Sequence, residues 1–285
     1  MIRSKDNFLQ VSDGAWIYFE DYGKDKGEPI MILHGFLCSS KFFYKNIDAL
    51  SADHRLVLID WRGHGSSSKT LQNLTMDRCA KDVHELIEYL GLEDVTLLGW
   101  SMGSSVVMEY YEQFGDEHLK KIGVIDSALY PFSPESWNSH SLAGFNMDAM
   151  TATLENALSH HDDYARTFTR LCFHTPPCQE DEDWVSTEMK KLPVYIAFAL
   201  YNDFLFKDYT ETLSKIDIPL LLCCADSPAI PRGIEMGRHY RDLVNGNCCF
   251  HEFLDLGHVM FLEDPEQFNK TILNFVDITR PFSPL

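Results

Sequence analysis

The chain has 285 residues, of which 45% are hydrophobic, and this length suits one large core or a core with an insertion. Its 43 acidic residues outnumber 24 Lys and Arg, and the net charge of -19 argues against nucleic acid or an anionic membrane as a partner. The first residues lack the apolar run of a secretory signal, and no segment is apolar enough to span a bilayer. We therefore expect a cytoplasmic protein.

Eight cysteines in a chain of this length do not indicate a disulfide framework. Two adjacent pairs lie in apolar, strand-like runs, which is typical of buried free thiols. These pairs are Cys223-Cys224 and Cys248-Cys249. Cys172, His174 and Cys178 offer three further ligands, but no second cluster accompanies them at a matching spacing, so we expect no metal site.

The first part of the chain alternates predicted strands with predicted helices. A β-hairpin is expected over residues 8–22, with its turn at residues 12–14. It is followed by a strand over 29–33, a helix over 39–50, a strand over 55–59 and an amphipathic helix over 75–90. This alternation is typical of a parallel α/β sheet with both faces covered.

The stretch that carries the clearest chemistry is Gly-Trp-Ser-Met-Gly at residues 99–103, between a strand-like run and a helix-compatible run. A serine in such a turn has a strained backbone and holds its hydroxyl at the carboxyl end of a sheet, while the glycines allow close packing. Ser101 is therefore a candidate nucleophile. The helix that starts at Met102 directs unpaired N–H groups toward the same point, which suits a developing oxyanion.

The alternation stops after a further strand over residues 121–126. Residues 130–213 are rich in aromatic, Met, His and Pro residues and predict helices, for example over 148–158 and 192–206, without a strand. The alternation then resumes with a strand over 219–224, a helix over 233–244, a strand over 248–254 and a closing helix over 265–279. We therefore expect a core of residues 1–129 and 214–285, and a helical cap of residues 130–213 inserted after the sixth strand.

Four motifs together resemble the α/β-hydrolase family, over nearly the whole chain outside the cap. They are His34-Gly35-Phe36, Asp60-Trp61-Arg62-Gly63-His64-Gly65-Ser66, Gly99-Trp100-Ser101-Met102-Gly103 and Asp255-Leu256-Gly257-His258. The cap and the Trp-Ser-Met turn are most similar to small esterases, lactonases and cofactor-free haloperoxidase or perhydrolase relatives. The resemblance implies an α/β-hydrolase fold, with a mostly parallel central sheet flanked by helices, and a triad in the order nucleophile, acid, histidine.

The resemblance also implies the base and the oxyanion hole. A serine hydroxyl needs a histidine that takes its proton and returns it to the leaving group. His258 follows the last strand in a Leu-Gly-His turn, where the family delivers its base. The oxyanion hole needs two backbone N–H donors, which by similarity are the amides of Phe36 and Met102. Asp60, Arg62 and His64 are expected to hold loops together rather than to take part in the chemistry.

The acid is the position at which the chain departs from the family pattern. Members usually carry Gly-x-x-Asp after the strand that here covers 219–224, whereas this loop has Ser227 or Pro228 at the expected place. Two alternatives remain open. Asp126 ends the preceding strand, where a minority of members carry the acid, and Asp226 could reach the histidine if the loop is out of the usual register.

The favoured function is a cofactor-free carboxylic ester hydrolase that forms an acyl-enzyme on a small to medium hydrophobic ester or lactone. The cap offers apolar surface for such a substrate. Its aromatic and Met residues include Phe132, Trp137, Phe145, Met147, Met150, Phe168, Phe173, Tyr195, Phe198 and Tyr201. We expect Trp100, Phe132, Trp137 and Phe198 to line the pocket, and the protein to be a monomer or a homodimer.

Two other functions stay open. Cofactor-independent dioxygenases of quinolone-like heterocycles share the displaced acid and the Trp-Arg-Gly-His-Gly loop, but they carry a histidine just past the His-Gly turn, where this chain continues with Leu37. A non-enzymatic ligand receptor would keep the triad and enclose its ligand under the cap. The displaced acid is the feature that keeps the receptor function as an alternative.

Overall fold

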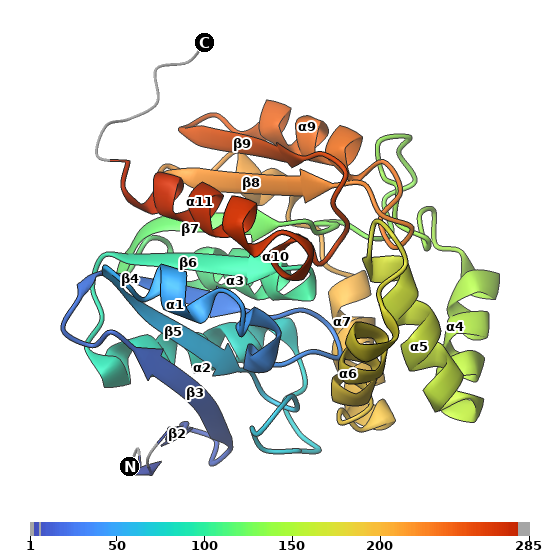
Figure 1. Ribbon diagram of the computed structural model, residues 1–285, viewed down its shortest axis with the longest axis horizontal. Coiled ribbons are helices and arrows are strands. Elements are labelled where there is room, and N and C mark those ends of the chain that lie inside the picture. The colour runs from blue at the N-terminus through green and yellow to red at the C-terminus, as the bar shows by residue number, and fades with distance from the viewer. Residues whose placement is uncertain (1–2, 6, 279–285) are drawn as a thin grey trace.

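One nine-stranded sheet runs through the part of the chain that the computed structural model describes, residues 3–5 and 7–278 (Figure 1). Its strands, in chain order, are β1 (Arg3–Lys5), β2 (Phe8–Gln10), β3 (Trp16–Tyr22), β4 (Gly27–Leu33), β5 (His54–Asp60), β6 (Val95–Trp100), β7 (Leu119–Ile125), β8 (Leu220–Ala225) and β9 (Cys248–Phe253). The spatial order is β1-β2-β3-β5-β4-β6-β7-β8-β9.

Strands β1, β2 and β3 pair antiparallel with their neighbours, and β3 is antiparallel to β5, whereas all remaining pairs are parallel. The predicted mostly parallel sheet and the hairpin over 8–22 are therefore confirmed, while β1 was not predicted. All six residues of both β6 and β8 are buried. Continuous burial of this kind arises because helices cover both faces of a parallel sheet.

The helices that pack on the sheet are α1 (Ile47–Leu50), α2 (Met76–Leu90), α3 (Met102–Phe114), α9 (Gly233–Leu243), α10 (Met260–Glu263) and α11 (Pro265–Val276). In Figure 1, α1 and α11 lie in front of the sheet, and α2 and α3 lie behind it. The predicted closing helix ends at Val276, and residue 279 lies outside the described residues. Within the described residues, no helix is both long enough and apolar enough to cross a bilayer.

The single helix predicted over residues 39–50 was wrong. The chain instead forms a 3₁₀ turn, η1 (Ser40–Phe43), and then the short helix α1. The Asn46 side chain, between them, donates hydrogen bonds to the Phe261 carbonyl at 3.3 Å and to Asn269 Oδ1 at 2.9 Å. These buried long-range contacts outweigh local helix propensity, which is a weak determinant on its own.

Residues 130–213, which we call the cap from here on, contain the helices α4 (Met147–Ser159), α5 (His161–Cys172), α6 (Gln179–Met189), α7 (Val194–Leu205) and α8 (Thr210–Leu213), and no strand. Figure 1 shows α4 to α7 together beyond the carboxyl ends of the parallel strands. The division of the chain into 1–129 with 214–285 and 130–213 stays an interpretation, and it extends over residues outside the described ones.

The motif after β5 holds loops through two separate networks. Arg62 is fully buried and makes a two-pronged ion pair with Asp82 on α2, with distances of 2.6 and 2.7 Å. Asp60 accepts hydrogen bonds from the backbone N–H groups of Ser40 and Ser66 at 2.6 and 2.7 Å. Charge-assisted bonds of this kind fix the loops near the carboxyl end of the sheet. The eight cysteines are free thiols, and of the two adjacent pairs Cys223-Cys224 is buried whereas Cys248-Cys249 is half-buried.

Candidate active site

Ser101 lies between β6 and α3 in a strained turn, with φ 54° and ψ −131°. The turn is closely packed: a Cβ atom at Gly103 would lie 2.5 Å from the His34 carbonyl oxygen, and one at Gly99 would lie 2.4 Å from the Gly103 carbonyl oxygen. The Ser101 N–H donates to the Ile125 carbonyl at 2.8 Å. The surrounding backbone therefore maintains a conformation that a serine rarely adopts, as is common at functional sites.

His258 and Asp126 form a buried pair at the carboxyl end of the sheet. His258 Nδ1 donates a 2.6 Å hydrogen bond to Asp126 Oδ2, and each residue is at most 3% exposed. The end of β8 holds Asp126 in place, because the Asp126 N–H donates to the Cys223 carbonyl and Asp126 Oδ1 accepts from the Ala225 N–H at 3.0 Å. The bond to Nδ1 fixes the proton there and leaves Nε2 free to accept another.

Asp226, the other carboxylate that the sequence left open, has a different contact. Its Oδ1 accepts a 2.9 Å hydrogen bond from the Ile234 N–H in the first turn of α9, and its side chain is exposed. A carboxylate in that place caps the helix and complements its dipole. Of the two candidates, the structure places Asp126 on His258.

The four residues expected to act on the acyl group line one cavity, whose volume is about 90 Å³. They are Ser101, His258, Phe36 and Met102. Met102 is the first residue of α3, so its N–H has no acceptor within the helix. Phe36 lies outside any helix or strand, and its N–H has no acceptor among the described residues. Both amides are thus available to a ligand oxygen next to Ser101.

The cap supplies most of the opposite wall. Neighbouring aromatic rings with centroids 4.9 to 6.4 Å apart form a continuous chain along it. In order, these are Tyr164, Phe168, Phe36, Tyr201, Phe204 and His140. Phe168 and Tyr201 belong to the cap aromatics that the sequence indicated. Aromatic rings thus form much of this wall, beside polar side chains that expose a similar area to the cavity.

Comparison with known proteins decides the family. A family model described as alpha/beta hydrolase fold matches residues 28–265. The chain belongs to the α/β-hydrolase family. The match spans β4 to the start of α11, so it includes both the turn between β6 and α3 that carries Ser101 and the turn that carries His258.

Individual relatives of this α/β hydrolase cover almost its whole length. It is 28% identical over 278 residues to a bifunctional esterase/perhydrolase of Acinetobacter calcoaceticus, covering 94% of this chain and 99% of that protein. It is 26% identical over 275 residues to a non-heme chloroperoxidase of Kitasatospora aureofaciens, covering 93% and 97%. A solved esterase structure from Exiguobacterium antarcticum matches with a TM-score of 0.86 at 24% identity, covering 95% and 99%, and this likeness shows the fold alone.

The prediction that Trp100 lines the pocket was wrong, because this side chain lies beneath the site of the hydrolase. It is 1% exposed, and its Nε1–H donates a 2.7 Å hydrogen bond to the His258 carbonyl. Its ring centroid lies 5.1 Å from that of His258 and 4.8 Å from that of Phe261. Trp100 therefore supports the loop that carries the histidine and leaves the cavity wall to others.

The three cap residues predicted for the pocket also lie outside the lining of this cavity. The Phe132 ring packs against Phe145 with centroids 4.7 Å apart, and the Trp137 ring stacks on His239 of α9 at 4.5 Å. Phe198 is half-buried on α7. Aromatic composition does not reveal which rings pack the cap internally or against the core, and this choice depends on helix orientation.

Sequence reasoning missed the polar part of the wall, which includes Ser127 and His140. Burial lowers the pKa of His140 to about 4, so its ring is neutral at pH 7. His140 Nδ1 accepts a 3.2 Å hydrogen bond from the Leu142 N–H, which puts the proton on Nε2. Among the described residues, neither His140 Nε2 nor the buried Ser127 hydroxyl has a hydrogen-bond partner. No local motif marks either residue in the sequence.

Proposed function

We propose that this α/β hydrolase is a carboxylic ester hydrolase that works through an acyl-enzyme on Ser101. The observation that carries the proposal is the 2.6 Å bond between His258 and Asp126 beside a cavity that Ser101 also lines. A buried carboxylate on Nδ1 keeps the imidazole in the tautomer that a general base needs. The esterase/perhydrolase relative, aligned over nearly the full length, supports the same reaction class.

In the proposed reaction, Ser101 Oγ attacks the carbonyl carbon of the ester while His258 Nε2 takes the hydroxyl proton. The carbonyl oxygen becomes an oxyanion, which accepts hydrogen bonds from the Phe36 and Met102 amides. When the tetrahedral intermediate collapses, the bond to the leaving alcohol breaks and His258 returns the proton to that alcohol. Water then attacks the acyl-enzyme by the same route and releases the acid.

The cavity favours a short ester or lactone, since its volume is small and aromatic rings form much of its wall. The hydrophobic substrate expected from the sequence suits the rings but not the polar groups of Ser127 and His140. The buried Ser127 hydroxyl has no partner among the described residues, and leaving it so costs free energy that a ligand oxygen offsets. The His140 Nε2–H is a second donor on the cavity wall. We therefore propose a neutral acyl group with a hydrocarbon part and an additional oxygen, such as a hydroxyl or ether.

The test is labelling with a fluorophosphonate together with turnover of p-nitrophenyl acetate, butyrate and octanoate. We expect the label on Ser101 by peptide mapping, faster turnover of the two shorter esters, and neither label nor turnover in Ser101→Ala. Circular dichroism of the variant checks that the fold is intact. Labelling at another residue, or a well-folded wild type without any label, contradicts the proposal.

Further assays on the same protein distinguish the proposed esterase from a dioxygenase and from a ligand receptor. Oxygen uptake with a hydroxyquinolone, without ester turnover, would favour a dioxygenase. Tight ligand binding with no turnover would favour a receptor. Since the relative of Acinetobacter calcoaceticus is named a perhydrolase, peracid formation with hydrogen peroxide tests whether a second acyl acceptor reaches the acyl-enzyme.

A further inference from the structure

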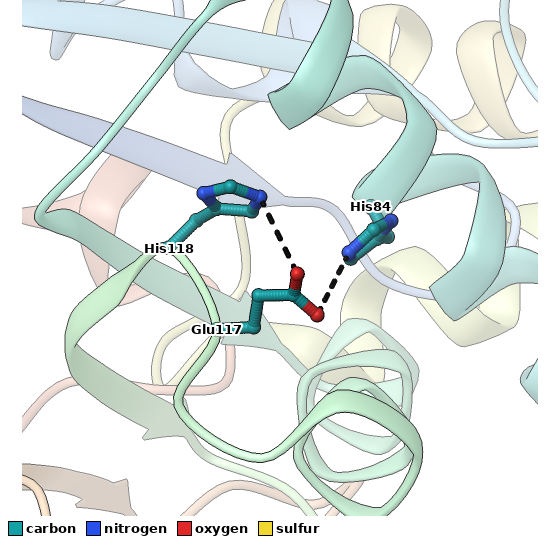
Figure 2. Close-up of side chains that lie close together, drawn as sticks. All are labelled: His84, Glu117 and His118. Atoms are coloured by element: carbon teal, nitrogen blue, oxygen red, sulfur yellow. Dashed lines mark ion pairs between the residues drawn. The ribbon is translucent and has the colours of Figure 1, made fainter.

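Three potential metal ligands meet at the amino ends of the parallel strands, whereas Ser101 lies at their carboxyl ends. Figure 2 shows His84, which comes from α2, facing Glu117 and His118 from the turn before β7. One ligand atom from each residue lies within 4.8 Å of the other two. His118 directly precedes β7 and Ser101 directly follows the parallel neighbour β6, so the cluster lies at the amino ends of the strands and the active site at the carboxyl ends.

The distances within the cluster suit a small cation. Glu117 Oε2 lies 3.4 Å from His84 Nε2, and Glu117 Oε1 lies 3.9 Å from His118 Nε2. Tetrahedral zinc with bonds of about 2.0–2.1 Å separates its ligand atoms by about 3.3 Å. The first pair already has this spacing, and the second needs a closure of about 0.6 Å to reach it, which a half-exposed Glu117 side chain allows. The ligand atoms of the two histidines lie within 4.8 Å of each other, so an ion would also draw the imidazoles together.

Two further carboxylates direct the imidazoles toward Glu117. Glu93 Oε2 lies 3.0 Å from His118 Nδ1, and Glu88 Oε2 lies 3.5 Å from His84 Nδ1. Both favour a proton on Nδ1, which leaves each Nε2 with its lone pair toward the Glu117 carboxylate. Carboxylates on the outer nitrogen are the usual support of metal-binding histidines.

The strongest single indication of a bound metal ion comes from His84 Nε2. This buried atom makes no hydrogen bond within the described residues, and its ion-pair neighbour Glu117 can only accept one. Two imidazole lone pairs and a carboxylate that face one another repel unless a positive charge lies between them. The three groups therefore need either extra protons on the imidazoles or a metal ion.

The cluster is held on ordered elements. The His84 ring stacks on Phe114 with centroids 4.1 Å apart. The Tyr110 hydroxyl donates to the Glu117 carbonyl at 2.9 Å, and the Val95 N–H donates to the His118 carbonyl at 2.9 Å. These contacts fix the His84 ring and the backbone at Glu117 and His118, so the exposed Glu117 side chain is the main part that must become ordered when an ion binds.

We propose that His84, Glu117 and His118 bind one divalent first-row transition-metal ion, with Zn²⁺ as the reference ion and water completing the coordination. Two imidazoles and a carboxylate without thiolate suit Zn²⁺, Ni²⁺ or Cu²⁺ better than Mg²⁺, which prefers oxygen ligands. The bound ion ties α2 to the turn before β7. It stabilises the folded state by mass action. It takes no part in the ester chemistry, which takes place at the carboxyl ends of the strands.

The test is calorimetric titration of tag-free, chelator-treated protein with ZnCl₂, with ester turnover measured in parallel. We expect one ion per wild-type chain, binding weakened by at least about tenfold in His84→Ala and in Glu117→Gln, and unchanged turnover. The Glu117 side chain is 55% exposed, so Glu117→Gln keeps the fold even if His84→Ala does not.

Two matched controls report on other ligands. The double variant His160→Ala with His161→Ala removes adjacent cap imidazoles, and Cys178→Ser removes an exposed thiol. Both should bind Zn²⁺ as wild type does. The proposal is overturned if wild type binds no ion, if Glu117→Gln binds as wild type does, or if only a control loses binding. The cluster would then be an ion pair between protonated histidines and Glu117.

Discussion

His258 Nδ1 donates a 2.6 Å hydrogen bond to Asp126 Oδ2, across 132 positions of the chain. The carboxylate follows β7, and the end of β8 holds it in place through the Ala225 N–H. The loop after β8, where the family usually carries its acid, instead directs Asp226 to the start of α9. The carboxylate that contacts His258 therefore follows β7, the strand next to β8, instead of β8 itself.

Replacing Asp126 should therefore abolish most of the ester turnover. Loss of a triad carboxylate costs on the order of 10⁴ in kcat, because the histidine tautomer and the imidazolium lose their support. We expect this loss for Asp126→Asn, whereas Asp226→Asn stays within about tenfold of wild type, or about 1.4 kcal/mol. Steady-state kinetics of both variants check the ranking, and the reverse order would assign the acid to Asp226.

Trp100 is expected to act as a positioning residue for His258. Trp100→Phe keeps the ring packing but removes the donor to the His258 carbonyl, and an unsatisfied buried carbonyl costs about 1–3 kcal/mol. We expect kcat to fall by roughly tenfold while KM changes little. Trp184→Phe, on α6 and 5.2 Å from the Phe42 ring, is the matched control. Equal kcat values in the two variants would argue against the positioning role.

Gly103 should not tolerate a side chain. Gly103→Ala places a methyl group 2.5 Å from the His34 carbonyl oxygen and 2.7 Å from that of Leu33, where backbone must move. Overpacking of this kind destabilises a core by about 1–3 kcal/mol. Urea unfolding measures the change. Ser105→Ala on the same helix is the control, since its buried hydroxyl has no partner among the described residues, and should leave stability unchanged or higher.

Stability should fall at mildly acidic pH because of buried neutral histidines. Burial lowers the pKa of His34 from 6.5 to about 4, although Asp60 nearby opposes the shift, and burial also lowers the pKa of His64. Between pH 6.5 and pH 4, the imidazole at position 34 is protonated in the unfolded chain but neutral in the folded protein. The free energy of unfolding therefore decreases as the pH falls. The loss from His34 alone is roughly 3 kcal/mol between pH 6.5 and 4.

Urea unfolding between pH 7.5 and 4 tests this dependence. In His34→Asn, whose amide can still donate to the Gly35 carbonyl as His34 Nδ1 does, the curve of stability against pH should be flatter. An unchanged slope in the variant would show that other groups cause the loss.

His140 should select substrates that carry an additional oxygen. His140→Leu removes the Nε2–H donor from the cavity wall and keeps a side chain of similar bulk. We expect kcat/KM for a hydroxy-substituted ester to fall by roughly tenfold, as one lost hydrogen bond implies, and kcat/KM for the plain ester to stay or rise. Paired kinetics with p-nitrophenyl lactate and propionate measure the ratio. A parallel change in both would mean that His140 only shapes the wall.

Local patterns in the sequence were enough for the alternation of strands and helices, the elbow at Ser101 and the turn at His258. The alternation follows from the local periodicity of apolar side chains, and the two turns were recognised from short motifs and from the order of these motifs along the chain. The same reasoning could not distinguish Asp126 from Asp226, since both follow buried strands.

Only the tertiary structure decided how distant segments meet. It brought Asp126 to His258, buried Trp100 beneath the site, and faced the cap residues Tyr201 and His140 toward Ser101 while Trp137 packed against α9. It also joined His84 to the turn before β7, although no motif links them. Such contacts depend on register, helix rotation and loop path, which arise from the packing of the whole core and not from any one stretch of sequence.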